Sequence, residues 1–403
     1  MYRVFLEIRT PSSIKKLFLS GQAWWNYYNK HKEHIRPAVI ENVIKLLSCG
    51  LTVIGYAKHE CSNKSCGHEK KISFSCKSRF CPTCGKKATD QWILTQRERL
   101  PKTKWQHITF TMPDKLWGLF DLNRFLLKEL SKRAAKIIKS LAKKKGLLPG
   151  IFTALHTFGR DLKWNVHIHL SVTCGGLTED KTKWKSMYFL HASVKKMWRY
   201  EIVSLLRKYY GKLKLPEELK NDYETKRGWD VFLDRQYKKE WMVELSEPSD
   251  SHMRNVNYLG RYLKRPPLSQ SRLKHYDGKE VFFNFLNHKT KKYEEASFEK
   301  EEFIERFVKH IPDKHFRMIN YYGFLAQRVS GQLLPKVYEL LGHVSEKVVQ
   351  LKFRFMQKKG FGCDPLKCIL CGSEMRYIGL VLGKSFRELK KYHRELATSK
   401  IVK

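Results

Sequence analysis

Hydrophobic and polar residues alternate along several short segments of the chain and follow a helical period along others. The segment 105–113 alternates, is rich in aromatic and β-branched residues and ends at Pro113, which predicts a strand. The basic segment 122–145 repeats its apolar residues at helical spacing and ends at Gly146, which predicts an amphipathic helix. The same criteria predict strands at 151–158, 166–173 and 241–245, a hairpin at 270–298 that turns at Asp277-Gly278, and helices at 12–50, 91–99, 183–210, 251–263 and 300–308.

Two of the predicted strands lie close enough in sequence to form a hairpin. A short connection at 159–164 joins strand 151–158 to strand 166–173. We therefore expect an α+β fold in which an antiparallel sheet is flanked by helices. The expected parts are a helical, cysteine-rich N-terminal domain at 1–100, a core at 101–330 with an insertion of weak character at 211–240, and a basic C-terminal region at 331–403.

The strand predicted at 166–173 carries His167 and His169 on one face. Two imidazoles are too few to hold a metal ion, so a third ligand is expected. If the hairpin folds about residues 161 and 162, His156 lies opposite 167 to 169 and on the same face. The sequence therefore predicts a metal site of His156, His167 and His169 with positions open for a substrate. The alternative for His156 is a hydrogen-bonded core histidine.

About ninety residues further on, Tyr258 and Tyr262 share one face of the predicted helix. Arg261, Lys264 and Arg265 lie beside them and are expected to contact phosphate groups. Two tyrosine hydroxyls that face a histidine metal site suit the cutting and rejoining of a nucleic-acid backbone. We therefore interpret Tyr258 and Tyr262 as nucleophiles.

Five of the ten cysteines lie in a short N-terminal stretch. Cys81-Pro82-Thr83-Cys84-Gly85 has the form of a zinc knuckle, in which the glycine lets the backbone approach the metal. A redox-active cysteine pair is the alternative. We expect one closed, structural zinc site made of Cys61, Cys66, Cys81 and Cys84, with Cys76, His59 and His68 as substitutes or as ligands of a second site.

A second cysteine group, Cys363, Cys368 and Cys371, lies near the C-terminus. It contains a knuckle pair but has no obvious fourth ligand, although His343 and His393 are candidates. The alternative is a free cysteine pair in a small hairpin. The remaining two cysteines have apolar neighbours and are expected to be small buried residues: Cys49 and Cys174.

The charge of the chain narrows the choice of partner. Among 403 residues, 79 Lys and Arg stand against 39 Asp and Glu, which gives a net charge of +40. This excess predicts a polyanion held through many phosphate groups, with binding that weakens in salt. No segment has the length and apolarity of a membrane span, and residues 1–10 do not resemble a secretory signal. We therefore expect a cytoplasmic, nucleoid-associated protein whose cysteines bind metal.

Six short motifs follow one another along the chain. They are SCKSRFCPTC at 75–84, HITFTMP at 107–113, LHTFGRDL at 155–162, HIH at 167–169, YLGRY at 258–262 and YYGFLA at 321–326. This series resembles the IS91-like transposases, which are HUH endonucleases with two catalytic tyrosines. The resemblance runs from the cysteine segment nearly to the C-terminus. One departure is Asn165-Val166 before the histidine pair, where the family pattern has His-Pro.

The resemblance implies an HUH core with an N-terminal zinc-binding domain. It implies a transposase that nicks and rejoins single-stranded DNA by tyrosine attack, through a 5′-phosphotyrosine, in rolling-circle transposition. The expected cofactors are Mg²⁺ or Mn²⁺ at the histidines and structural Zn²⁺ at the cysteines. The expected partners are single strands and hairpins at transposon ends, target DNA and a host helicase, because the sequence contains no ATPase motif.

Three other functions compete with this one. A plasmid rolling-circle replication initiator or relaxase would use the same chemistry. A non-enzymatic zinc-ribbon DNA-binding protein would use the cysteines and the charge but neither tyrosine. A 2H-type phosphoesterase would use His107 and His169, each followed two residues later by Thr or Ser, and would need neither metal nor tyrosine.

Overall fold

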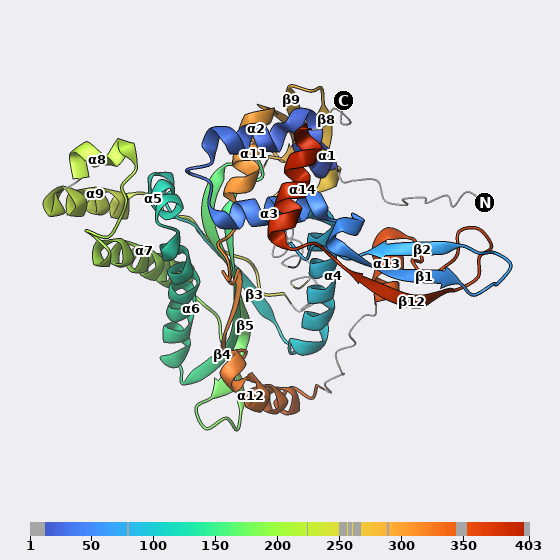
Figure 1. Cartoon of the computed structure of the whole chain (residues 1–403). Coiled ribbons are helices and arrows are strands. Elements are labelled where there is room, and N and C mark those ends of the chain that lie inside the picture. Colours follow the sequence, from blue (N-terminus) through green and yellow to red (C-terminus); the bar gives the residue numbers. More distant parts are fainter. Residues whose placement is uncertain are drawn as a thin grey trace.

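The computed structural model shows a mixed fold of helices and antiparallel sheets (Figure 1). No helix among the residues it describes combines the length and the apolar character needed to cross a bilayer. The described residues are 13–78, 80–223, 225–249, 256, 260, 267–287, 290–343 and 353–398.

The main sheet has the predicted histidine hairpin at its centre. In sheet order its strands are β11 (Ile319–Gly323), β4 (Leu147–Phe158), β5 (Trp164–Thr178), β3 (Trp105–Phe110) and β7 (Val243–Leu245), with β6 (Trp184–Ser186) paired to the far part of β5. Neighbouring strands are antiparallel throughout this sheet. The expected α+β fold with an antiparallel sheet is therefore confirmed.

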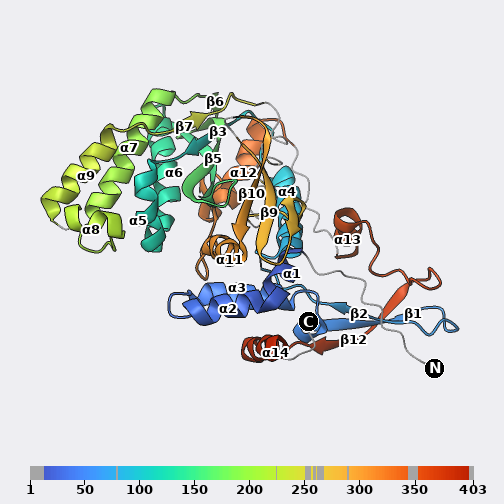
Figure 2. The same ribbon diagram turned by 90° about the horizontal axis from the view of Figure 1, so that it is seen from above.

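Helices cover one face of the main sheet (Figures 1 and 2). They are α5 (Trp117–Leu122), α6 (Leu127–Lys143), α7 (His191–Lys208), α8 (Glu217–Tyr223) and α9 (Lys226–Lys238). Ile168 and Leu170 of β5 are buried beneath them together with Leu130 and Ile137 of α6. The predicted amphipathic helix is thus confirmed in α6, whose apolar side packs on the sheet.

Residues 211–240 contain the two helices α8 and α9, so the prediction of a weakly structured insertion was wrong. Trp229, Phe232 and Leu233 recur at helical spacing and are buried. The Thr225 side chain caps the start of α9. Charged residues surround these apolar positions in α9, so the short helical stripe was not evident from the sequence.

The opposite face of the main sheet is covered by α4 (Pro82–Arg99) and α12 (Gln327–Leu340). Phe152 of β4 packs edge-on against Trp92 of α4, and Trp92 Nε1 donates a hydrogen bond of 3.1 Å to the Tyr321 hydroxyl. α4 is longer than the helix predicted at 91–99, because it already begins at the cysteine knuckle with Pro82 in its first turn.

Helices from the N-terminal and C-terminal parts of the chain pack together with a second three-stranded sheet beside the main sheet (Figure 2). The elements are α1 (Ser13–Leu19), α2 (Ala23–His31), α3 (Pro37–Ser48), β8 (Leu273–Tyr276), β9 (Glu280–Leu286), β10 (Tyr293–Glu299), α11 (Lys300–Lys309) and α14 (Phe386–Thr398). Trp25 Nε1 of α2 donates to the backbone carbonyl of His393 in α14 at 3.0 Å. This packing crosses the boundaries expected near residues 100 and 330.

A three-stranded antiparallel sheet projects from the molecule (Figure 1). In sheet order it consists of β12 (Met375–Leu382), β1 (Gly55–Cys61) and β2 (Glu69–Ser73). Arg354 of α13 (Phe353–Phe361) forms an ion pair with Glu374, directly before β12. The C-terminal strand β12 thus pairs with the N-terminal strand β1. The described part of 331–403 therefore joins other parts of the fold instead of forming a region of its own.

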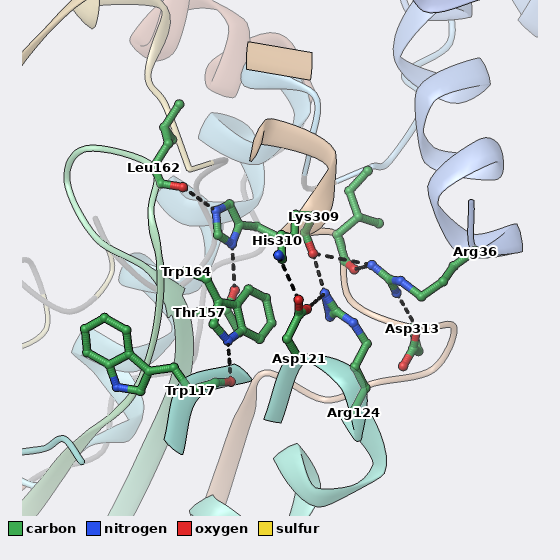
Figure 3. A network of polar contacts seen from close by, with 11 residues as sticks. Arg36, Trp117, Asp121, Arg124, Thr157, Leu162, Trp164, Lys309, His310 and Asp313 are labelled. Atoms are coloured by element: carbon green, nitrogen blue, oxygen red, sulfur yellow. Dashed lines mark hydrogen bonds and ion pairs between the residues drawn. The ribbon is translucent and has the colours of Figure 1, made fainter. Parts of the chain in front are cut away.

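A buried polar network joins α11 to the histidine hairpin (Figure 3). His310, directly after α11, is buried; its Nε2 donates to the Leu162 carbonyl at 3.0 Å, and its Nδ1 accepts from Thr157 Oγ1 at 3.2 Å. Burial lowers the pKa of His310 to about 3, so the imidazole is neutral at pH 7 and can both donate and accept. Trp164 stacks on His310 with 5.7 Å between ring centroids. These contacts fix the hairpin strands next to their turn.

Charged groups extend this network to α3 and α5 (Figure 3). The Asp121 carboxylate forms ion pairs with Arg124 at 3.5 Å and with Lys309 Nζ at 2.8 Å. Arg36, directly before α3, donates to the Ile311 carbonyl at 2.6 Å. The N-terminal helices and the histidine hairpin are therefore held in one arrangement.

Candidate functional site

The histidine hairpin brings three imidazoles together. β4 and β5 pair with His156 opposite His167, in the register that the sequence predicted. One ring nitrogen from each of His156, His167 and His169 lies within 4.8 Å of the others. His156 is buried, whereas His167 and His169 are half-buried, so the group is partly accessible from outside. The convergence expected from the strand pattern is present.

Hydrogen bonds and burial set the chemical form of the two β5 histidines. His167 Nδ1 lies 2.9 Å from the Asn165 carbonyl oxygen, so Nδ1 carries the proton and Nε2 keeps its lone pair. His169 Nδ1 lies 3.0 Å from His107 Nε2. Burial lowers the pKa of His167 to about 4 and also lowers the pKa of His169. Neutral imidazoles oriented in this way are the form that binds metal.

Three imidazoles on one hairpin suit an open metal site. Three protein ligands leave coordination positions for water or for a substrate oxygen. By donor chemistry, imidazole favours Mn²⁺, Zn²⁺ and related ions over Mg²⁺, which prefers oxygen ligands.

His107 of β3 contacts this group, whereas the sequence paired His107 with His169 only in the 2H-type alternative. Its ring lies 5.2 Å from that of His169, and its Nδ1 lies 3.4 Å from Ser171 Oγ. Residue 107 faces residue 171 only because β3 is the neighbour of β5, which no pattern within 105–113 reveals. A 2H-type phosphoesterase would have to hold a phosphate between His107 and His169. The direct hydrogen bond between these two side chains leaves no space for one.

The tyrosine motif is only partly described. Val256 and Gly260 are helical. Val256 shares a core with Trp92 of α4, and a Cβ atom on Gly260 would lie 2.2 Å from Ile93. Both residues therefore pack on α4, on the sheet face that carries the histidines. The five predicted nucleophiles and phosphate contacts lie outside the described residues: Tyr258, Arg261, Tyr262, Lys264 and Arg265.

Four cysteines converge at the start of α4: Cys49, Cys76, Cys81 and Cys84. Their sulfurs are separated by 3.6 Å (Cys49–Cys84), 3.5 Å (Cys76–Cys84) and 3.5 Å (Cys49–Cys81). Four thiolates around zinc, with Zn–S of about 2.3 Å, lie about 3.8 Å from one another. The cluster therefore fits a closed tetrahedral zinc site. Cys49 is part of it, so its interpretation as an ordinary core residue was wrong.

The single zinc site predicted from the sequence is divided between two clusters. Cys81 and Cys84 belong to the cluster at α4, whereas Cys61 and Cys66 lie at the far end of β1 and in the turn that follows it. The grouping was wrong because the projecting sheet carries Cys61 and Cys66 away from α4. The second cluster consists of Cys61, Cys66, Cys368 and Cys371.

Other predicted zinc ligands have different positions. Cys363 is exposed and belongs to neither cluster. His393 Nε2 lies 2.9 Å from Ser48 Oγ, among the N-terminal helices. His68 touches the second cluster, since its Nδ1 lies 3.1 Å from Cys368 Sγ. Within the described ranges, His59 and His343 belong to no group of metal-binding side chains.

A basic groove of about 580 Å³ lies beside α6, on the sheet face away from the histidines. Lys132, Lys136, Lys139 and Lys143 line one of its walls. Lysines repeated along a groove can follow a phosphate backbone without reading its sequence.

Known proteins resemble this chain both in its cysteine-rich part and in its main sheet. Residues 150–332 match a family described as "Putative transposase", and residues 20–112 match one described as "Transposase zinc-binding domain". The transposase for insertion sequence element IS801 of Pseudomonas savastanoi pv. phaseolicola is 41% identical over 397 residues, which cover 98% of this chain and 96% of that protein. "Putative transposase y4qJ" of Sinorhizobium fredii (strain NBRC 101917 / NGR234) is 30% identical over 305 residues, which cover 73% and 76% respectively. No solved structure matches the chain.

Proposed function

The chain belongs to the IS91-like transposases, and we propose that it nicks and rejoins single-stranded DNA at the ends of an insertion sequence in a rolling-circle scheme. A transposase is an enzyme that cleaves and transfers DNA strands. The main sheet, whose strands all fall within residues 101–330, is the proposed HUH nuclease core.

The convergence of His156, His167 and His169 supports this proposal most strongly. The three side chains come from adjacent strands and share a face with Val256 and Gly260, which frame the first tyrosine of the motif. A strand-cleaving enzyme needs a cation beside the scissile phosphate and a nucleophile within reach. Val256 and Gly260 pack on the histidine side of the sheet, which supports a nucleophile in this part of the chain.

In the proposed reaction, the phenolic oxygen of Tyr258 or Tyr262 attacks the phosphorus of a DNA phosphodiester. A bond forms between phosphorus and the tyrosine oxygen while the bond from phosphorus to the 3′ oxygen breaks. The phenol gives up its proton, and the departing 3′ oxygen takes one up as a free 3′-OH. Mg²⁺ or Mn²⁺ at the histidines would supply Lewis-acid polarisation of the phosphate. The second tyrosine can hold a second strand, so rejoining needs no external energy.

Zinc at Cys49, Cys76, Cys81 and Cys84 would fix the start of α4. This helix reaches the histidine face through Trp92 and Ile93, so it connects the zinc site to the nuclease core. In the proposed complex, the cysteine-rich part grips hairpins at the transposon ends, and a host helicase unwinds the DNA. Target DNA is the other substrate, and phosphate contacts beside the tyrosines come from Arg261, Lys264 and Arg265.

A metal-dependent covalent adduct tests the proposal. Wild-type protein with labelled single-stranded DNA from the element's ends and Mn²⁺ is expected to give a protein–DNA band on a denaturing gel, and EDTA should abolish it. His167→Ala should slow adduct formation at limiting Mn²⁺ by about 100-fold, because the substitution removes a direct metal ligand.

His191→Ala is the matched control for His167→Ala. His191 is the first residue of α7, which covers the sheet face away from the three histidines, and its Nε2 donates a hydrogen bond of 2.6 Å to the Val243 carbonyl. The variant should therefore keep the wild-type rate. An adduct that resists EDTA, or a His167→Ala variant with the wild-type rate, would contradict the metal site. The absence of any adduct with authentic ends would contradict the nuclease.

His107 is expected to position the metal ligand His169. If His169 Nδ1–H donates to His107 Nε2, the His169 ring presents Nε2 to the ion. His107→Ala should then weaken Mn²⁺ binding by about 10- to 100-fold, as is usual for the hydrogen-bond partner of a ligand. His107→Gln can still accept the hydrogen bond and should keep part of the affinity. Electron paramagnetic resonance can measure the Mn²⁺ affinity of the DNA-free protein during a titration. A His107→Ala variant with the wild-type affinity would exclude this role.

A further inference from the structure

The second cysteine cluster joins distant parts of the chain. Cys61 Sγ lies 3.4 Å from Cys371 Sγ, 310 positions away, and Cys66 Sγ lies 3.8 Å from Cys368 Sγ, 302 positions away. All four sulfurs lie within 4.8 Å of one another. These separations approach the roughly 3.8 Å between thiolates in a tetrahedral zinc site and greatly exceed the S–S bond length of about 2.05 Å.

We propose that Cys61, Cys66, Cys368 and Cys371 bind a second structural zinc ion. This ion would fasten the C-terminal part of the chain to the hairpin of β1 and β2. The matched zinc-binding domain spans residues 20–112, so it contains the first two ligands but neither of the last two. The site is therefore split between the two ends of the chain, separately from the cluster at α4.

The projecting sheet has little apolar packing of its own. Its hydrophobic cluster consists of buried Cys61, Cys368 and Met375 with half-buried Cys66, so most of its members are the proposed ligands. On β12, Leu382 is 81% exposed. A small sheet without an apolar core needs a crosslink to stay folded, and a zinc–thiolate centre is a common one. Zinc at this position would explain why the three strands remain paired.

A tight backbone turn and a histidine beside the sulfurs suit zinc binding. The Gly372 amide donates to the Cys368 carbonyl at 3.0 Å, and Gly372 has φ of +75°, so the chain turns back tightly after the last ligand. His68 Nδ1, at 3.1 Å from Cys368 Sγ, can donate its N–H to a thiolate. Such donors stabilise the negative charge that four zinc-bound thiolates carry.

Metal analysis of the full-length protein tests the split site. The Cys368→Ser/Cys371→Ser variant should contain one zinc ion per chain fewer than wild type. Cys66→Ser, from the other half of the site, should lose the same ion. With the crosslink removed, limited proteolysis within 363–382 should become about tenfold faster in both variants.

Cys363→Ser is the matched control, because Cys363 belongs to the same C-terminal group but is exposed and outside both clusters. It should keep both ions and the wild-type protease resistance. A double variant with the same zinc content as wild type would overturn the proposal. A thiol titration of denatured, metal-free wild type that found four thiols too few would indicate two disulfides in place of the zinc ion. These measurements involve no DNA, so their failure would be distinct from a failure of the nuclease.

Discussion

Replacing both Tyr258 and Tyr262 by Phe is expected to abolish the covalent protein–DNA adduct and to lower DNA cleavage by at least about 10⁴-fold. Loss of the nucleophile in covalent catalysis costs on the order of 10⁴- to 10⁶-fold, because no atom remains to form the bond to phosphorus. Phenylalanine keeps the size and apolar character of the ring, so the fold should persist. Single-turnover cleavage of labelled single-stranded DNA with Mn²⁺ measures the effect.

Tyr321, which belongs to another tyrosine pair, supplies the matched control. The Tyr321 hydroxyl accepts a hydrogen bond of 3.1 Å from Trp92 Nε1, and burial raises the pKa of Tyr321. Tyr321 is therefore held in the core as a neutral phenol, and Tyr321→Phe should still form the adduct. An adduct that survives in the Tyr258/Tyr262 double variant would show that another residue is the nucleophile. Loss in only one single variant would identify the initiating tyrosine.

Cys81→Ala is expected to release the zinc ion from the cluster at α4 and to lower the free energy of unfolding by about 5 kcal/mol or more. Structural zinc contributes roughly 10–16 kcal/mol to the folding of zinc-finger peptides. Cys81 is buried in the same core as Trp24 and Phe80, so the variant leaves three sulfurs there without the charge of the ion. Urea denaturation followed by tryptophan fluorescence reports on this core through Trp24 and Trp25.

Cys174→Ala separates loss of zinc from loss of a buried sulfur. Cys174 is also buried, but it lies on β5 and belongs to neither cluster. Its replacement should cost only about 1–2 kcal/mol and release no metal. A Cys81→Ala protein that kept its full zinc content and its stability would show that the zinc ligands lie elsewhere.

The histidine group was predictable from local patterns. Both hairpin strands alternate, and the short connection between them restricts the register to one that places residue 156 opposite 167. Once the register is known, the pleat puts the three imidazoles on one face. The order of the motifs likewise indicated a transposase, which the relatives confirm.

Contacts between elements that are distant in sequence were not predictable in this way. His107 reaches His169 only because β3 is placed beside β5, and the alternating pattern of 105–113 is the same whichever strand is its neighbour. The helices of 211–240 were missed for a different reason, since their apolar stripe is short and set among many charged residues.

Sequence patterns alone were sufficient for the antiparallel hairpin, the three histidines, the family and the presence of a zinc-binding domain. The grouping of the cysteines depended on tertiary packing. A local pattern records which way side chains point within one helix or strand, but it does not record which element lies next to it. Cys61 meets Cys371 because β12 pairs with β1, and Cys49 meets Cys84 because the end of α3 lies against the start of α4. Ten chemically equivalent thiols can be divided among ligand sets in many ways, and only the packed chain selects one of them.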